Sequence, residues 1–344
     1  MTELQATTTN KYGWRLWLGL AFSVICIWLV LRGVDLGQLA HALRQVRLYL
    51  LFLALLSVVL TFLAKAARWR LLFADSGAPA PPLGRAFAII CIGMLVNSFL
   101  PARLGEVVRA YLIGERGRKS YALGTIVVEK VADLVFLVVA VAILLTQHSL
   151  PPWLIEPARV TVLLMLVAVF VCLFLAWWDE PAMKLLALLS RMLPLKWRAW
   201  LERQVRLGLT SLKVLRRPGL VLLLLSWSIL VWMLGALTNY LVFLGMGLTL
   251  PASAALLLLV VLQAGVAVPS SPGRLGVFHY LTVLTLSLFA VGKEEALGYA
   301  VVLHLAVYLP MLILGLWYLW REGDAWQHFW PTKTNLRGLM RKGT

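Results

Sequence analysis

Charged residues are scarce in this sequence, and acidic residues are the scarcest. Only 14% of the 344 positions are charged, 61% are hydrophobic, and the mean hydropathy is +0.87. Soluble domains are about one-quarter charged and less apolar. Several apolar runs approach the roughly 20 residues that cross a bilayer. The composition therefore excludes an ordinary soluble protein and predicts a polytopic membrane protein.

Cysteines are also few, and familiar catalytic signatures are lacking. Cys26, Cys91 and Cys172 lie far apart within apolar runs, so we interpret them as small apolar residues rather than as a metal cluster or a disulfide framework. The sequence contains no metal-ligand spacing, nucleophile elbow or glycine-rich nucleotide loop. We therefore expect no enzyme activity, no metal and no cofactor.

Basic residues are plentiful by contrast: 32 Lys and Arg against 15 acidic residues give a net charge of +17. They lie mostly between apolar runs and form no nucleic-acid-binding motif, so we expect no nucleic-acid partner. Segments 103–119, 179–217 and 321–344 are basic, as cytoplasmic loops that face anionic lipid are. The N- and C-termini are therefore predicted to be cytoplasmic, although Arg32, Arg44 and Arg47 in the first external loop run against this rule.

The apolar runs predict six full spans and two shorter elements. The spans are expected at 14–31, 48–64, 122–145, 160–178, 220–244 and 297–320. Runs 86–100 and 254–268 stop at prolines and are short for a crossing, so they predict re-entrant or broken helices. The cations of 65–70 are interpreted as interfacial anchors around Trp69. Segment 179–217 is predicted to form amphipathic helices on the inner leaflet.

A five-residue motif recurs half a chain apart. PARLG at 101–105 returns as PGRLG at 272–276, and neighbouring spans match at the same offset of 171 positions (101 to 272). Each half then holds three crossings and one broken helix. Because three is odd, the halves insert in opposite orientations, as in the inverted repeats of secondary transporters.

The predicted fold is therefore an all-α polytopic membrane protein of two inverted repeats. Each repeat has about three transmembrane helices and one broken or re-entrant helix. The predicted parts are a disordered tail over 1–13, a first repeat over 14–147, a second repeat over 148–320 with the basic insert 179–217, and a basic tail over 321–344.

The two motifs predict an anion site. Pro101 and Pro272 each break a helix, and Gly105 and Gly276 allow conformations that other residues avoid. Irregular backbone at membrane depth survives only inside protein or beside a wet cavity. The amides of a restarting helix favour an anion, and the guanidinium groups of Arg103 and Arg274 suit phosphate. That these arginines only reach the interface or an internal carboxylate stays open.

Carboxylates at membrane depth are the second candidate feature. Glu106 and Arg109 are three residues apart, and Glu129 and Asp133 four apart, so each pair shares a helical face. Such carboxylates are costly unless they are paired or hydrated. We expect partners among Lys130, Arg103 and Arg109, or a role in carrying a proton, and a purely structural ion-pair network stays open.

The second half lacks these charges, since Val277 and Tyr280 occupy the positions of Glu106 and Arg109. His279, Tyr280 and His304 are candidates to line the same cavity, while hydrogen bonding between helices is the alternative role for the histidines. The carboxylate chemistry is therefore expected on the side of the first half.

These residues carry a family resemblance. The run from Asn97 through PARLG and Glu106 to Arg109, then Glu129-Lys130 with Asp133, then PGRLG, resembles the lysylphosphatidylglycerol synthase transmembrane region family. The resemblance covers nearly the whole chain. It implies a flippase-like protein of the inner membrane. Members work with aminoacylated phospholipids, polyprenyl-linked sugars or hopanoid lipids. Glu129 is followed here by Lys130 where arginine is frequent.

The predicted function is translocation of an anionic or phosphate-bearing lipid, such as an aminoacyl-phospholipid or a polyprenyl-phosphate lipid. No aminoacyl-transferase domain follows the last span, so we expect no synthesis of lysyl-phosphatidylglycerol. Lipid-modifying enzymes, glycan-assembly enzymes and a second copy of the chain are the partners left open. The predicted head-group site comprises Asn97, Pro101, Arg103, Gly105, Glu106, Arg109, Glu129, Asp133, Pro272, Arg274, Gly276 and Tyr280.

Three other functions stay open at this stage. One is a membrane-embedded lipid-modifying enzyme that uses Glu129, Asp133 and the histidines. Another is an ion channel or exchanger of the same architecture. The third is a scaffold without transport activity in a lipid-linked glycan pathway.

Overall fold

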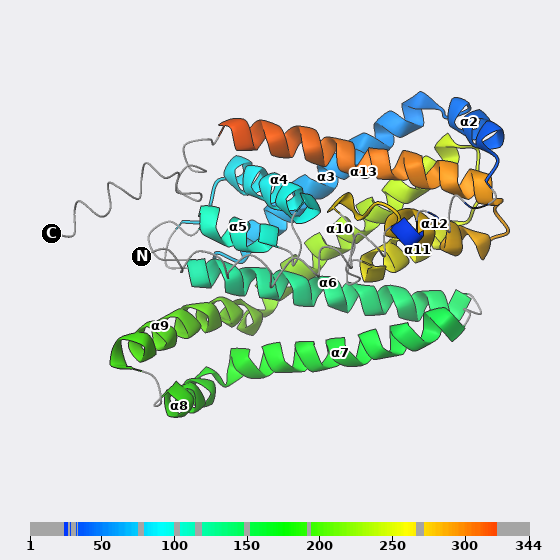
Figure 1. Cartoon of the computed structure of the whole chain (residues 1–344). Coiled ribbons are helices and arrows are strands. Elements are labelled where there is room, and N and C mark those ends of the chain that lie inside the picture. The colour runs from blue at the N-terminus through cyan, green and yellow to red at the C-terminus, as the bar shows by residue number, and fades with distance from the viewer. Residues whose placement is uncertain are drawn as a thin grey trace, which may run out of the picture.

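The regular elements of the structure are helices. The computed structural model describes residues 24–26, 28, 32, 34–74, 79–99, 104–113, 119–147, 152–190, 194–265 and 272–321. The first-half helices are α2 (Leu36–Arg44), α3 (Leu48–Leu71), α4 (Leu83–Phe99), α5 (Leu104–Ile113) and α6 (Lys119–Gln147) (Figure 1). They are followed by α7 (Pro152–Trp177), α8 (Asp179–Leu189), α9 (Leu195–Leu212) and η3 (Lys213–Arg216). The remaining elements are α10 (Pro218–Gly245), α11 (Ala252–Gly265), η4 (Pro272–Arg274), α12 (Val277–Ser287) and α13 (Lys293–Arg321).

Three of these helices, α3, α10 and α13, have both the length and the apolar composition of a membrane span. They contain 24, 28 and 29 residues, and a helix of that length reaches beyond the roughly 30 Å of a hydrocarbon core. Helix α6 is also 29 residues long but has charged residues in its first half. The predicted all-α polytopic membrane fold is therefore confirmed. The predicted span 14–31 and the two tails fall almost wholly outside the described residues.

The chain reverses direction between the two short helices α4 and α5. Helix α4 is 17 residues long and α5 only 10. Their antiparallel contact is fixed at both ends: Arg85 Nη2 donates to the Leu112 carbonyl at 3.4 Å, and Gly105 N–H donates to Asn97 Oδ1 at 2.8 Å. The sequence left open whether this element crosses or returns. The contacts show that α4 and α5 form an antiparallel hairpin, as a re-entrant element would.

The second break is formed by the PGRLG motif. Gly273, Arg274 and Gly276 have φ angles of 70°, 55° and 87°. Glycine adopts such left-handed angles readily, but for arginine they are uncommon and cost free energy. The break separates α11 from α12, which pack against each other. The predicted interruption near Pro272 is therefore present, and it holds Arg274 in a strained conformation.

The helices recur in the same order in the two halves. The corresponding starts are Leu48 and Pro218, Leu83 and Ala252, Leu104 and Val277, and Lys119 and Lys293, each about 170 positions apart. Packing recurs as well, because α4 lies against α13 as α11 lies against α6. Helices α3 and α10 make the most extensive contact and run antiparallel: Arg47 N–H donates to the Gly245 carbonyl at 2.8 Å, and Ser57 Oγ donates to the Leu234 carbonyl at 3.0 Å.

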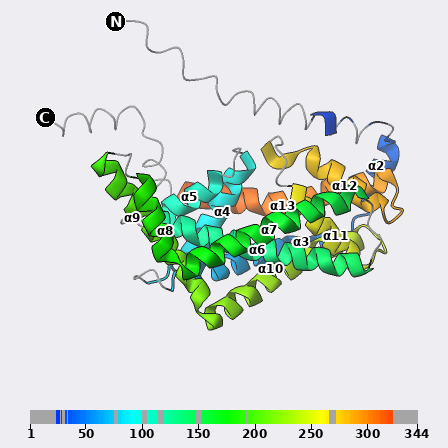
Figure 2. The same ribbon diagram turned by 90° about the horizontal axis from the view of Figure 1, so that it is seen from below.

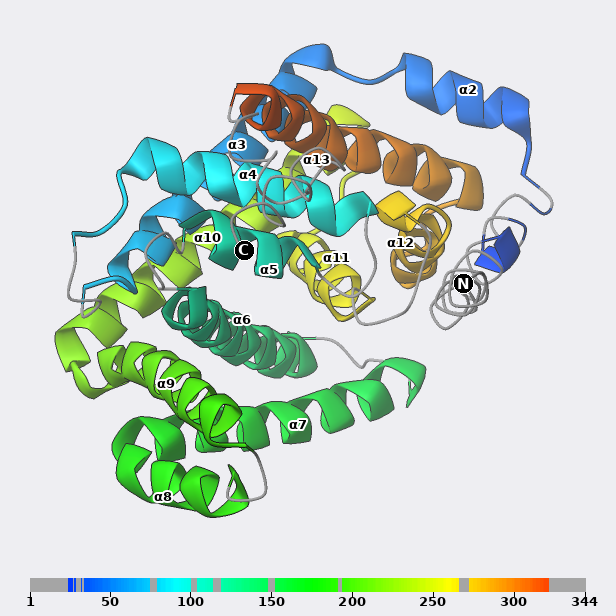
Figure 3. The same ribbon diagram turned by 60° about the vertical axis from the view of Figure 1, so that its left-hand side comes forward.

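Helices α7 to α9 form a layer on the far side of α6 from α13 (Figures 1 and 3). Figure 2 shows the same layer from below, with α7 crossing in front of α6. Helix α8 leaves α7 at an angle of 92°. The insert 179–217 forms two helices, α8 and α9, as predicted. The junction between the two halves is therefore formed by α3–α6 and α10–α13.

Candidate functional site

Arg68 on α3 joins the two acidic residues of α6. Its Nη2 donates to Glu129 Oε1 at 3.0 Å, while Nη1 donates to Asp133 Oδ1 at 2.6 Å and to Ser228 Oγ at 3.0 Å. The Arg68 side chain is fully buried, and that of Glu129 is 3% exposed. The planar guanidinium group of arginine carries several N–H donors, so a single side chain can bind two carboxylates at once. The network thus ties both halves together, since Ser228 belongs to α10.

A second arginine completes the pairing of Glu129. Arg109 Nη2 on α5 donates to Glu129 Oε2 at 2.7 Å, and its guanidinium group lies 4.4 Å from the ring centroid of Trp69. A cation over an indole face is stabilised electrostatically. Lys130 forms a separate pair with Glu106 at 2.9 Å. Of the three partners that the sequence left open, Arg109 pairs with Glu129, whereas Lys130 pairs with Glu106 instead of with a carboxylate on its own helix.

The interpretation of residues 65–70 as interfacial anchors is wrong for two of them. Arg68 and Trp69 are both 0% exposed, and Trp69 Nε1 donates to Thr125 Oγ1 at 3.0 Å. Helix α3 ends at Leu71 rather than at 64, so its last turns lie inside the protein against α4 and α6. The carboxylates of α6 compensate the charge of Arg68 in the protein interior. The sequence around Arg68 does not reveal these partners, because they lie on another helix.

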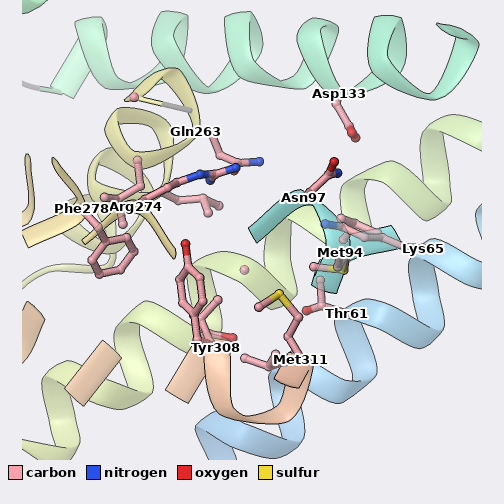
Figure 4. A pocket seen from close by; sticks show the side chains of 18 of the residues that line it. Thr61, Lys65, Met94, Asn97, Asp133, Gln263, Arg274, Phe278, Tyr308 and Met311 are labelled. Carbon is pink, nitrogen blue, oxygen red and sulfur yellow. The ribbon is translucent and has the colours of Figure 1, made fainter. Parts of the chain in front are cut away.

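A cavity of about 410 Å³ lies between the two halves, a volume typical of small-molecule sites. Four predicted site residues line it: Asn97, Glu106, Asp133 and Arg274. In Figure 4, Arg274 points into the cavity from one side, while Asn97 and Asp133 lie on the other. The strained backbone at Arg274 therefore positions a guanidinium group in this space.

Other predicted residues support the cavity wall or lie elsewhere. Arg109 and Glu129 are buried in the network behind Asp133, and Gly105 holds the Asn97 amide. An added Cβ at Gly105 would lie 2.7 Å from the Asn97 side chain, so glycine is required for this close approach. Gly276 caps α12, and Pro272 begins η4. Pro101 and Arg103 lie outside the described residues.

The second half presents aromatic residues rather than the expected ones. His279, Tyr280 and His304 were candidates to line the cavity, with hydrogen bonding between helices as the alternative for the histidines, but the cavity lining of α12 and α13 includes Phe278 and Tyr308 and none of these three. The His304 ring stacks on Tyr308 with centroids 4.0 Å apart and on His279 at 5.1 Å. Tyr308 lies one turn after His304 on α13, and of the three stacked rings only Tyr308 lines the cavity, so the two histidines lie behind it.

Lys65 and Gln263 are polar residues of the cavity that were not predicted, and Thr61, Ser98, Thr238 and Asn239 also belong to its lining. Gln263 is a lone amide within the apolar run of α11, and a polar group at membrane depth is a signal of function. Lys65 was hidden among the basic residues at the end of α3. Lys65 and Arg274 supply hydrogen-bond donors only, whereas Gln263 can both donate and accept.

Comparison with known proteins agrees with this architecture. The family model described as "Lysylphosphatidylglycerol synthase TM region" matches residues 16–315. The chain belongs to this family. It is also similar to a UPF0104 membrane protein of Methanocaldococcus jannaschii, with 26% identity over 231 residues, which are 64% of this chain and 92% of that protein. Membership of the lysylphosphatidylglycerol synthase TM region family agrees with the resemblance stated from the sequence motifs.

Proposed function

We propose that this protein is a lipid translocase that carries an anionic or phosphate-bearing head group through the cavity between its halves. The observation that carries this proposal is Arg274, which strained backbone holds in a cavity at the junction of the two halves. Ionisable side chains at membrane depth mark substrate pathways by default. The acyl or prenyl tails stay in the surrounding lipid while the head group passes through the cavity.

An inverted-repeat architecture supports the proposal. Helices α3 and α10 hold corresponding places in the two halves and run antiparallel. A two-fold rotation that exchanges two antiparallel helices has its axis perpendicular to both of them. Because both helices cross the membrane, this axis lies in the plane of the membrane. Secondary transporters of this design bind substrate near the bilayer midplane and alternate access by moving one repeat against the other. The hairpin of α4 and α5 and the break at η4 are the irregular elements that this design requires.

The charged network gives the first half a distinct role. Arg68, Arg109 and Glu129 form a rigid wall behind Asp133. Arg274, together with Arg103 of the other motif, binds the phosphate group, and Glu106 and Asp133 set the charge of the cavity. The lipid leaves chemically unchanged, so in this proposal the protein is not an enzyme.

The proposed orientation follows from charge. In Figure 1 the start of α6, helix α9 and the end of α13 lie at one end of the molecule. We assign this end to the cytoplasmic face of the inner membrane because α9 lies in the basic segment 179–217, α6 begins where the basic segment 103–119 ends, and the basic segment 321–344 follows α13 in the sequence.

Translocation by purified protein tests the function. Proteoliposomes containing a fluorescent phosphatidylglycerol analogue report its movement through quenching by dithionite. The wild-type protein is expected to accelerate exchange between leaflets, and Arg274→Ala to abolish that acceleration. Arg198→Ala is the matched control, since Arg198 pairs with Glu202 on the surface of α9. Equal rates for wild type and Arg274→Ala would overturn the assigned role, and a chemically altered lipid would indicate an enzyme.

A further inference from the structure

Lys65 is a cavity-lining cation on the first half of the protein, and it lies near carboxylates that are already paired. Asp133 accepts from Arg68 at 2.6 Å, and Glu106 pairs with Lys130 at 2.9 Å. Among the described residues, the Lys65 ammonium group has no carboxylate within 4.0 Å and makes no hydrogen bond. Burying a cation without a partner is costly. A ligand that supplies the missing negative charge would explain why lysine occupies this position.

Asn97 has its orientation fixed so that it offers donors to the same space. The Gly105 N–H can only donate, so the Asn97 atom that accepts from it at 2.8 Å must be the carbonyl oxygen Oδ1. The amide group Nδ2, which carries two hydrogens, is then left to face the cavity. Figure 4 shows Asn97 beside Lys65, with Gln263 and Arg274 extending toward them from the other wall.

The ligand chemistry follows from this set of donors. Lysine and arginine donate hydrogen bonds and cannot accept them, and the fixed Asn97 amide also donates. The cavity-lining charges are Lys65, Lys130 and Arg274 against Glu106 and Asp133, which leaves an excess of one positive charge. The matching ligand is an anion with several acceptor oxygens and no donor facing the site, as in a phosphodiester or phosphomonoester.

We propose that Lys65 and Asn97 bind the phosphate oxygens of the transported lipid from the first half, opposite Arg274 on the second half. This inference rests on the proposed function and adds the contribution of α3 and α4 to it. The phosphate group is then held by both halves at once. An anion bound in this way compensates the partly buried charge of Lys65, so the site is most stable when it is occupied.

Direct binding tests the inference separately from transport. The full-length protein, in nanodiscs of phosphatidylcholine, is titrated with dihexanoyl phosphatidylglycerol, with inorganic phosphate and with dihexanoyl phosphatidylcholine. We expect phosphatidylglycerol to bind with the lowest Kd. Lys65→Gln is expected to raise that Kd at least about tenfold, the scale of one charge-assisted hydrogen bond. Lys65→Arg retains the charge and is expected to retain binding, and Lys184→Gln, at an exposed position on α8, is the control.

Asn97→Asp is an independent variant for the same site. The aspartate keeps an oxygen for the Gly105 N–H and has the same size, but it replaces the donor with a negative charge. It is expected to weaken phosphatidylglycerol binding at least as much as Lys65→Gln does. Thermal unfolding of Lys65→Gln gives a second measurement, because removing a partly buried charge without a partner is expected to leave Tm unchanged or raised. A purely structural lysine would lower Tm when replaced.

Each outcome bears on a different part of the inference. Kd values for Lys65→Gln and Asn97→Asp within about twofold of wild type, with binding lost in Arg274→Ala, would overturn this inference and leave the proposed function standing. Inorganic phosphate that binds as tightly as phosphatidylglycerol would support the anion site and overturn its assignment to a lipid. Equal affinity of wild type for the two lipids, both of which carry a phosphodiester, would support recognition of the phosphate group and overturn the expected preference for an anionic head group. No saturable binding of either lipid to wild type would overturn the proposed function and this inference together.

Discussion

Arg68 and Glu129 are 61 positions apart in the chain, yet their side chains are joined at 3.0 Å with almost no exposure to solvent. Arg109 reaches the other oxygen of the same carboxylate at 2.7 Å. Helices α3, α5 and α6 are thus held by one acidic side chain between two guanidinium groups. This wall positions Asp133 and the rest of the first half around the cavity.

Breaking the Arg68 network is expected to destabilise the protein strongly. Arg68→Lys cannot donate to Glu129, Asp133 and Ser228 in the same geometry, and Glu129→Gln leaves two buried guanidinium groups short of a counter-charge. Removing one partner of a buried ion pair costs about 3–5 kcal/mol. Thermal unfolding in detergent measures the loss. Arg198→Ala, which breaks an exposed pair of α9, should cost no more than about 1 kcal/mol, and equal losses in all three variants would contradict the buried network.

The antiparallel contact of α3 and α10 predicts a specific cross-link. A Cβ at Gly245 would lie 3.6 Å from the Leu50 Cβ, which is within the range for a disulfide. Leu50→Cys with Gly245→Cys, in a background without Cys26, Cys91 and Cys172, should therefore oxidise to an intramolecular disulfide. Mass spectrometry of the digested protein detects the bridge.

The control for this cross-link pairs Leu50→Cys with Gly219→Cys at the opposite end of α10, where no atom lies within 4 Å of the added Cβ. That pair should remain reduced. A bridge from residue 50 to residue 219 in preference to residue 245 would mean parallel helices, and it would remove the basis for the inverted repeat.

The contact between α6 and α9 depends on a glycine. A Cβ at Gly124 would lie 2.6 Å from the Gly208 carbonyl and would also collide with Ser211 Oγ. Because backbone must move to make room, Gly124→Ala is expected to destabilise the protein by about 1–3 kcal/mol. Gly208→Ala meets only the Ser120 carbonyl at 3.7 Å, so it should be neutral or stabilising by up to about 1 kcal/mol. Unfolding midpoints that rank the two alanine variants in the reverse order would contradict this packing.

Asp179 predicts a pH dependence of the layer formed by α7 to α9. Hydrogen bonds from Lys213 and Arg216 hold the pKa of this carboxyl below its ordinary value. A lowered folded-state pKa stabilises the contact above the ordinary pKa of about 4, and this stabilisation is lost as pH falls through the lowered pKa. Hydrogen exchange in residues 179–217, corrected for intrinsic rates, should therefore rise in acid.

Asp179→Asn supplies the control for this pH effect. The variant cannot form the ion pairs, so its exchange should already be raised at neutral pH and should change less in acid. If exchange in the variant followed the wild-type pH profile, another group would have to control the contact.

Most of the helical organisation was predictable from local patterns. The lengths of the apolar runs predicted α3, α6, α7, α10 and α13. The prolines of the two motifs predicted the ends of the short helices α4 and α11. The sequence analysis placed the end of α3 too early because Lys65, Arg68 and Arg70 resemble the cations that anchor a span at the interface. Only the fold shows that the partners of Arg68 lie on α6.

The site was predictable where charge stands out against an apolar background. Glu106, Glu129, Asp133 and Arg274 were found in this way, and all belong to the cavity or to the wall behind it. Tyr280 was chosen by its offset from Arg109, but Phe278 is the aromatic residue of α12 that lines the cavity. The exact face depends on helix packing, which a repeat offset alone does not determine.

The extensive contact between α3 and α10 has a mechanical consequence. These helices are exchanged by the proposed two-fold axis, and their contact includes a hydrogen bond from Thr238 Oγ1 to Ser57 Oγ at 3.0 Å. Two small side chains at one point of a contact leave less packing to rearrange there when the helices turn on each other. Any rigid rotation of one half relative to the other would therefore have its fulcrum at Ser57 and Thr238, and bulky substitutions there would act on the rate of turnover rather than on affinity for the head group.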